Sequence, residues 1–379
     1  MQRKIPLTRP SVGEEELRAI RGVLESGMLT QGTVTRQFET EFAKYINVEN
    51  AVATSSGTTA LDLALLTLGI GPGQEVLVPD FTFPATGNVV FHVGARPVLV
   101  DIDIKTYNVD PEKIEKAITE RTKAIIPVHL FGQPAEMEAI MEVAERHSLY
   151  VIEDAACGIG ATYHGKTVGT FGDVACFSFH PRKTLSTGEG GMFVTNNDEI
   201  AEKARALKDH GKKTVSGKGQ FLYAGYNFRL SDILSAIGRV QLKKVDDLIK
   251  KRVELARRYS RILGEVEGIS IPYESANVRH TYQTYCLMIK KERMRDMLIE
   301  RLGERDIETG IGTYALHVQP CYMKHKDLIR MDLTSSGKAY RNTLALPLYN
   351  YMKEEDQDYV CSNLESLLAR PAFSQHKSD

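Results

Sequence analysis

The sequence predicts an α/β fold, in which a mostly parallel sheet lies between helices and a smaller α+β domain follows toward the C-terminus. Three observations lead to this prediction. Short apolar runs alternate with helical patterns through most of the first half of the chain, a long amphipathic segment follows from Ser231, and a looser mixture of patterns comes after it. A chain of 379 residues also exceeds the size at which one hydrophobic core usually stops growing, so two domains are expected.

Seven short runs are expected to form the strands of the sheet, namely AVATS, EVLVP, RPVLVDI, AIIPVHL, LYVIEDA, VACFSF and MFVTN. Their continuous apolar and β-branched character is typical of strands that are buried on both faces. The helical patterns between them include TTALDLALLTLG, DPEKIEKAIT and PAEMEAIMEVAERH. These begin with Thr, Asp or Pro, which helix N-termini favour, and carry apolar residues at three-to-four spacing.

The smaller domain is expected to follow a long helix, SDILSAIGRVQLKKVDDLIKKRVELARRYSRIL. Beyond it, TYQTYCLMI predicts a strand, and ERMRDMLIERL and EEDQDYVCSNLESLLA predict helices. We therefore divide the chain into a large domain, residues 1–245, and a small domain, residues 246–379. The N-terminal segment could still pack on the small domain.

Composition excludes several classes of function. The formal net charge of -1 provides no field for nucleic acid or an anionic membrane, and no apolar stretch reaches the ~20 residues of a membrane helix. The N-terminus has no apolar signal core, so a cytoplasmic location is expected. Neither a disulfide framework nor a metal site is expected, because the histidines lack helical pairing and no CxxC motif occurs among Cys157, Cys176, Cys286, Cys321 and Cys361.

Two of the predicted strands end in polar groups, and open α/β sheets bind ligands at the carboxyl ends of their strands. After the first strand, Ser56, Gly57 and Thr58 open a helix whose free amides and hydroxyls suit a phosphate, although an ordinary helix cap is the alternative. LYVIED ends in Glu153 and Asp154, where a carboxylate could pair with a cationic ring nitrogen or a metal. A helix cap or a core salt bridge is the alternative there.

Two further strand ends carry an aromatic face and an amine. Phe81 and Phe83 follow VLVPD, where either ring could lie against a planar ligand or simply pack. Lys183 lies in FSFHPRKTLSTGEGG beside Arg182, and a lysine near another cation in a partly dry pocket becomes a nucleophilic amine. Surface charge is the alternative for Lys183. Together, a phosphate site, a carboxylate, an aromatic face and an amine are the groups that pyridoxal phosphate requires.

The ordered motifs of the chain resemble those of the DegT/DnrJ/EryC1/StrS family of sugar aminotransferases, which have the fold of aspartate aminotransferase (fold type I). The resemblance rests on IPLTRPSVGEEEL, LESGMLTQG, FETEFAKY, SSGTTALDLAL, PDFTFPATGN, RPVLVDID, KAIIPVHLFGQP, EDAACGIGA, FSFHPRKTLSTGEGG, GYNFRLSDILSAIGRVQL and LPLYNYM. It covers nearly the whole chain. It implies a seven-stranded, mostly parallel sheet and pyridoxal phosphate as cofactor.

The resemblance also implies roles for individual residues. Lys183 would bond to the cofactor's aldehyde and then shuttle a proton, and Asp154 would pair with the pyridine nitrogen. Phe83 would stack on one face of the ring, with Ala156 near the other. The phosphate would be held by Ser56, Gly57, Thr58 and Ser178.

Asn227, by the same resemblance, would reach the phosphate of a neighbouring subunit's cofactor, which makes a homodimer with shared active sites the expected assembly. Without the resemblance, Asn227 would be read as a helix cap. Arg229, Tyr314 and His317 fall where the family contacts its substrates, although Tyr and His in such loops are commonly structural. Cys157 departs from the family pattern, because many relatives carry Gln or His there.

The implied reaction is transfer of an amino group from L-glutamate to a nucleotide-linked keto sugar by a ping-pong mechanism. TGEGG after Lys183 resembles members that aminate the fourth sugar carbon. One alternative is a dehydratase of the same family, similar to aminohydroxybenzoate synthase, and another is a non-catalytic regulator. An NAD-dependent oxidoreductase is disfavoured, because GIGPG follows a helix and carries Gln74 where the last glycine of the fingerprint belongs.

Overall fold

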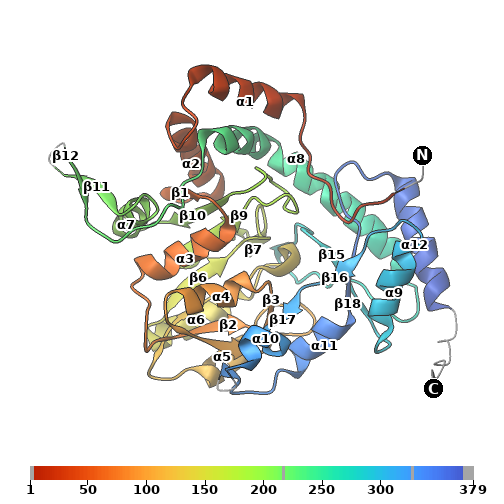
Figure 1. Cartoon of the computed structure of the whole chain (residues 1–379). Helices are drawn as coiled ribbons and strands as arrows, with labels where there is room; N and C mark the ends of the chain where they lie inside the picture. The colour runs from red at the N-terminus through yellow and green to blue at the C-terminus, as the bar shows by residue number, and fades with distance from the viewer. Residues whose placement is uncertain (1–3, 216–217, 326–327, 370–379) are drawn as a thin grey trace.

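A seven-stranded sheet lies at the centre of the molecule, in the strand order β1-β10-β9-β6-β5-β2-β4 (Figure 1). A computed structural model describes residues 4–215, 218–325 and 328–369. Each predicted run supplies one strand: β1 (Asn50–Thr54), β2 (Glu75–Pro79), β4 (Arg96–Val100), β5 (Thr122–Ile125), β6 (Tyr150–Asp154), β9 (Val174–Ser178) and β10 (Gly191–Thr195). Within this sheet only β10 runs antiparallel to its neighbours, so the predicted, mostly parallel sheet is confirmed.

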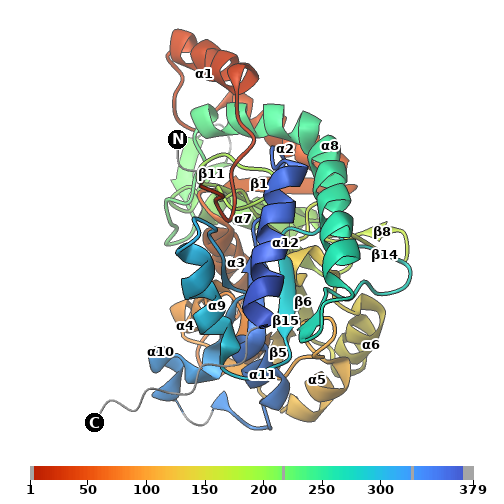
Figure 2. The same ribbon diagram turned by 90° about the vertical axis from the view of Figure 1, so that its right-hand side faces the viewer.

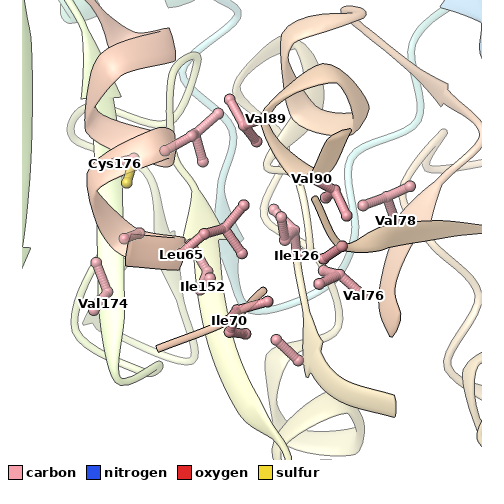
Figure 3. Close-up of a cluster of buried hydrophobic side chains, with 14 of the residues drawn as sticks. Leu65, Ile70, Val76, Val78, Val89, Val90, Ile126, Ile152, Val174 and Cys176 are labelled. Carbon is pink, nitrogen blue, oxygen red and sulfur yellow. The ribbon is translucent and has the colours of Figure 1, made fainter. Parts of the chain in front are cut away.

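Helices cover both faces of the sheet because successive strand residues point to opposite sides. Val76 and Val78 face a core with α3 and α4, whereas Leu77 between them faces α5 and α6. Figure 3 shows the first of these cores, with strand residues meeting Leu65 of α3 and Val89 and Val90 of α4. The helices of this part are α1 (Glu14–Ser26), α2 (Thr33–Ile46), α3 (Gly57–Thr67), α4 (Ala85–His92), α5 (Pro111–Ala117), α6 (Met137–His147) and α7 (Asp198–Leu207).

The long helix α8 (Asp232–Leu263) connects the two halves of the structure. Its first part packs against α1 and α2 (Figure 2). Its last part supplies Leu255, Tyr259 and Leu263 to a second core. That core also includes Ile5, whose N–H donates to the Asp306 carbonyl at 2.8 Å. It surrounds an antiparallel sheet of β13 (Ile269–Ser270), β15 (Tyr285–Ile289), β18 (Thr343–Leu346) and β16 (Gly310–Ile311), with α9 (Met294–Gly303) and α12 (Glu354–Leu368).

One segment of the C-terminal half returns to the large sheet. β17 (Tyr314–Ala315) pairs with β3 (Phe81–Thr82), and Leu316, Tyr322, Leu328 and Leu333 pack in the core beneath α3 and α4. The boundary at residues 245 and 246 falls inside α8, so the division into two domains remains a proposal. The smaller elements are β7 (Thr162–Tyr163), β8 (Lys166–Thr167), β11 (Lys212–Val215), β12 (Lys218–Phe221), β14 (Val278–Arg279), α10 (Pro320–Met323), α11 (Thr334–Asn342) and two 3-10 helices, η1 (Leu130–Gly132) and η2 (Leu316–Val318).

The strand predicted for residues 281–289 begins only at Tyr285. Tyr282 adopts the left-handed region with φ of 48°, which ends any extended run. The amide groups of Thr281 and Thr284 instead donate to the carbonyls of Gly132 and Phe131, at 3.1 and 3.4 Å. Residues 281–284 therefore form a loop, here called the crossing loop, that bonds to the segment after β5 before the small sheet begins.

In the part of the chain that the structure describes, no helix combines the length and apolarity needed to cross a membrane.

Candidate active site

The segments that carry Lys183 and Asp154 meet at one edge of the central sheet. β6 and β9 are parallel neighbours, with Asp154 opposite Cys176, so the chain leaves both strands on the same side. Lys183 lies in the loop after β9, and its Nζ is 3.1 Å from the Sγ of Cys157, three residues beyond Asp154. The predicted amine and the predicted carboxylate are thus brought to one place.

Asp154 carries a buried carboxylate, with only 5% of the residue exposed. Thr86 donates its hydroxyl to Oδ2 at 2.8 Å, and the Ala156 amide donates to Oδ1 at 3.1 Å. Burial raises the pKa of Asp154, while these hydrogen bonds and the charge of Lys183 oppose the rise. A cationic group placed against this carboxylate would therefore favour its ionised form. Sequence reasoning missed Thr86, because nothing in its pattern distinguishes it from an ordinary helix residue.

Glu153, the neighbour of Asp154, has a different role. It is fully buried, and its Oε2 accepts from the Nε2 of His129 at 3.0 Å. The Nδ1 of His129 accepts from the Ala135 amide, so the ring hydrogen lies on Nε2. Burial acts to raise the pKa of Glu153, but its hydrogen bonds outweigh this and lower it. The carboxylate also accepts from three amides of one loop, those of Gly169, Phe171 and Gly172.

The start of α3 lies against the end of β9. Ser56 caps the helix, because its Oγ accepts from the Thr59 amide at 3.1 Å while Thr59 Oγ1 accepts from the Ser56 amide at 3.0 Å. The amides of Gly57 and Thr58 lie in the first turn, where an α-helix offers them no carbonyl. A Cβ at Gly57 would come within 2.8 Å of Ser178 Cβ and 3.3 Å of its Oγ. The four residues predicted to hold a phosphate therefore meet in one place.

The two phenylalanines after β2 separate in the structure. Phe81 is fully buried, where its ring contacts Tyr107 and Phe131. Phe83 is 63% exposed, and its ring meets that of Tyr314 edge-on, with centroids 6.3 Å apart. Only Phe83 therefore has a free aromatic face of the kind that a planar ligand could cover.

Two of the three predicted substrate residues, His317 and Arg229, pair with acidic side chains. His317 Nδ1 lies 2.6 Å from Asp80 Oδ2, and this hydrogen bond raises the pKa of His317. Arg229 pairs with Asp209. Among the described residues, neither His317 nor Arg229 has a hydrogen bond or ion pair to Lys183 or Asp154.

Asn227 lies on the surface of its own chain. Its side chain is exposed, and its backbone bridges to Asp209. The next residue, Phe228, accepts a hydrogen bond from the Ser55 amide at 2.8 Å. This contact ties the Asn227 segment to the strand end that leads into α3.

Comparison with known proteins identifies the family. The model of the DegT/DnrJ/EryC1/StrS aminotransferase family matches residues 10–365. The chain belongs to this family. It is therefore an enzyme of the aminotransferase class, in a family of sugar aminotransferases, and the predicted fold is confirmed.

Two curated relatives of this aminotransferase span nearly the same length. The spore coat polysaccharide biosynthesis protein SpsC of Bacillus subtilis is 38% identical over 377 residues, covering 96% of this chain and 97% of SpsC. GDP-perosamine synthase of Caulobacter vibrioides is 41% identical over 335 residues, covering 88% of this chain and 89% of that enzyme.

Among solved structures, Spr1654 of Streptococcus pneumoniae in its PLP form has a TM-score of 0.91 and 27% identity to this aminotransferase. The match covers 96% of this chain and 98% of Spr1654. The same protein has also been solved in a PMP form.

We expect Glu153→Gln to destabilise the folded aminotransferase by about 2–4 kcal/mol at neutral pH, because an amide nitrogen would face N–H donors. The folded-state pKa of Glu153 is lowered, so its contribution is complete above the unfolded pKa of about 4.3 and is lost as pH falls through the folded value. The gap between wild type and variant in denaturant unfolding should therefore narrow in acid. Glu142→Gln, on an exposed position of α6, is the control. Equal unfolding of Glu153→Gln and wild type at neutral pH would contradict the assigned role.

Proposed function

We propose that this chain is a pyridoxal-phosphate-dependent aminotransferase that moves an amino group from L-glutamate to a nucleotide-linked keto sugar. The preferred acceptor in this proposal is a 4-keto-6-deoxy sugar. The observation that carries it is the placement of the Lys183 amine 3.1 Å from Cys157, three residues beyond the buried Asp154, whose pKa the charge of Lys183 acts to lower. The start of α3 lies against Ser178, at the end of the strand that leads into the Lys183 loop. Family membership and the named activity of the GDP-perosamine synthase relative support the substrate class.

The residues of the site fit pyridoxal phosphate. The first turn of α3 lies so close to Ser178 that a Cβ at Gly57 would clash with Ser178. Backbone amides of α3 and the Ser178 hydroxyl are therefore available together to bind an anion. Asp154 is a buried carboxylate whose pKa is raised by burial, so a ring N–H⁺ is the partner it lacks. Phe83 offers an exposed ring face. The PLP and PMP forms of Spr1654, a relative of this fold, support the same cofactor.

The bound cofactor supplies an electron sink that stabilises negative charge on the carbon losing its proton. Lys183 would hold the cofactor through Nζ and then accept and return that proton at the same atom. Asp154 would keep the ring nitrogen protonated, with Thr86 and Ala156 fixing its two oxygens. Ser56, Gly57, Thr58 and Ser178 would hold the phosphate, and Phe83 and Ala156 would border the two ring faces.

Substrate contacts are proposed for Arg229, Tyr314 and His317. Tyr314 lies against Phe83 and so borders the proposed ring site. The hydrogen bond to Asp80 raises the pKa of His317, which favours its cationic form. Such a cation suits the diphosphate of a nucleotide-linked sugar.

A homodimer with shared sites is the proposed assembly. Asn227 is exposed in the single chain although its segment is fixed beside the phosphate site, so its amide is free to serve a second subunit. The nearby hairpin of β11 and β12 projects from the body in Figure 1 and continues into exposed apolar residues. These are Phe221, Leu222, Tyr223 and Tyr226.

The function is tested by incubating the purified protein with pyridoxal phosphate, L-glutamate and a panel of nucleotide-linked keto sugars, and measuring product mass. We expect an aminated sugar and 2-oxoglutarate in equal amounts, and borohydride should fix the cofactor to Lys183. Lys183→Ala and Asp154→Asn should fold but lose activity by about 100-fold or more. A dehydrated product without added nitrogen would favour the dehydratase alternative. Cofactor binding without any turnover would favour the regulator.

Gly57→Ala should weaken cofactor binding by about 10-fold or more, because its methyl group would displace Ser178 from the phosphate site. Titration of the cofactor's absorbance measures the dissociation constant. The matched control is Gly303→Ala at the end of α9, where a Cβ would meet no atom within 4 Å. Wild-type affinity in Gly57→Ala would argue against a phosphate at the start of α3.

Mixing Lys183→Ala protein with Asn227→Ala protein should restore activity if each site uses Lys183 from one subunit and Asn227 from the other. Random reassociation after mixing should yield about a quarter of wild-type activity, since half of the dimers are mixed and each mixed dimer has one intact site. The assay compares the mixture with each variant alone after subunit exchange. A mixture no more active than the sum of its parts would refute the shared site.

A further inference from the structure

The loop that carries Lys183 has little regular structure of its own. Lys183 follows β9, and its amide closes a turn onto the His180 carbonyl at 2.8 Å. The polar backbone groups on either side of Lys183 are bound by one distant side chain. Gln283 donates its Nε2 to the Arg182 carbonyl at 2.5 Å, and its Oε1 accepts from the amide and the hydroxyl of Thr184 at 2.8 and 2.9 Å.

Gln283 is itself buried and hydrogen-bonded. The residue is 5% exposed and lies in the crossing loop, residues 281–284. Arg252 of α8, 3% exposed, donates Nη2 to the Gln283 carbonyl at 2.6 Å and Nε to the Tyr282 carbonyl at 3.2 Å. Burial lowers the pKa of Arg252 to about 10, so the guanidinium stays charged at neutral pH and its hydrogen bonds remain charge-assisted.

The crossing loop also touches the segment that supports Asp154. Thr281 donates its amide to the Gly132 carbonyl, and a Cβ at Gly132 would come within 2.5 Å of Thr281 Oγ1. Three residues earlier, the His129 amide donates to the Asp154 carbonyl at 3.1 Å. One loop therefore contacts the supports of both the amine and the carboxylate.

We propose that Gln283 is a positioning residue that sets the position of the Lys183 amine relative to Asp154. Arg252 fixes Gln283 in turn by its hydrogen bond to the Gln283 carbonyl. This inference rests on the proposed function, in which Lys183 and Asp154 act on the same cofactor. Gln283 acts through the backbone on both sides of Lys183 and touches neither the amine nor the carboxylate. Its loss leaves the Lys183 loop free to shift, and a small displacement of a reacting group is costly to catalysis.

The test compares Gln283→Met with Gln357→Met in the cofactor-loaded enzyme. Gln357 is a fully buried glutamine on α12 that donates Nε2 to the Leu255 carbonyl at 2.8 Å, so it controls for the loss of a buried hydrogen bond. We expect Gln283→Met to lower kcat by about 10- to 100-fold with little change in KM for the amino donor. It should also shift the pH midpoint of the cofactor's visible absorbance, whereas Gln357→Met should change stability without either effect.

Gln283→Glu provides a second variant, because it keeps the acceptor for Thr184 and loses the donor to Arg182 when ionised. Its kcat and absorbance midpoint should lie between those of wild type and Gln283→Met. If Gln283→Met does not fold, Gln283→Glu alone decides: wild-type kcat and midpoint would overturn the inference.

Borohydride fixation at Lys183 in the wild type distinguishes a failure of the proposed function from a failure of the positioning role. Without fixation the proposed function fails, and with fixation but control-like Gln283 variants only the positioning role fails.

Discussion

The parallel pairing of β6 with β9 is the constraint on which the rest of the site depends. Because Asp154 lies opposite Cys176, the segments that follow both strands leave the sheet together, and Lys183 Nζ comes to 3.1 Å from Cys157. A parallel ladder fixes this relation through backbone hydrogen bonds, which are independent of side-chain identity. The chemistry of the edge is then supplied by the few residues that the chain places there.

Two adjacent carboxylates, those of Glu153 and Asp154, have different roles: the first stabilises the fold and the second is available to a ligand. Successive strand residues point to opposite faces, so Glu153 and Asp154 meet different surroundings. Glu153 is saturated by His129 and by loop amides, which lower its pKa and leave it no capacity for a ligand. Asp154 has two hydrogen bonds and a pKa raised by burial, so it is the carboxylate that a cationic partner would stabilise most.

Support for the site comes from parts of the chain that are far apart in sequence. Gln283 binds the backbone on both sides of Lys183, and Arg252 of α8 donates to the Gln283 carbonyl. Tyr314 contacts Phe83 because β17 pairs with β3. The small and large sheets are therefore joined around the site itself as well as through α8. A shift of the crossing loop would displace the Lys183 amine through the hydrogen bonds of Gln283. Movements of the C-terminal half could therefore affect the proposed reaction.

Hydrophobic period and helix-start signals are local, so the pattern of residues was enough to predict the seven strands, most of the helices between them and the polar groups at the strand ends. Residue patterns alone could not separate Glu153 from Asp154 or Phe81 from Phe83, since each choice depends on what the folded chain packs around the residue. Only the resemblance to the family selected Asp154 and Phe83. The pattern also predicted that the β15 strand begins at Thr281, whereas the left-handed conformation of Tyr282 delays its start to Tyr285. No sequence pattern pointed to Thr86 or Gln283. Their roles come from contacts across 68 and 99 residues, which only the tertiary structure creates.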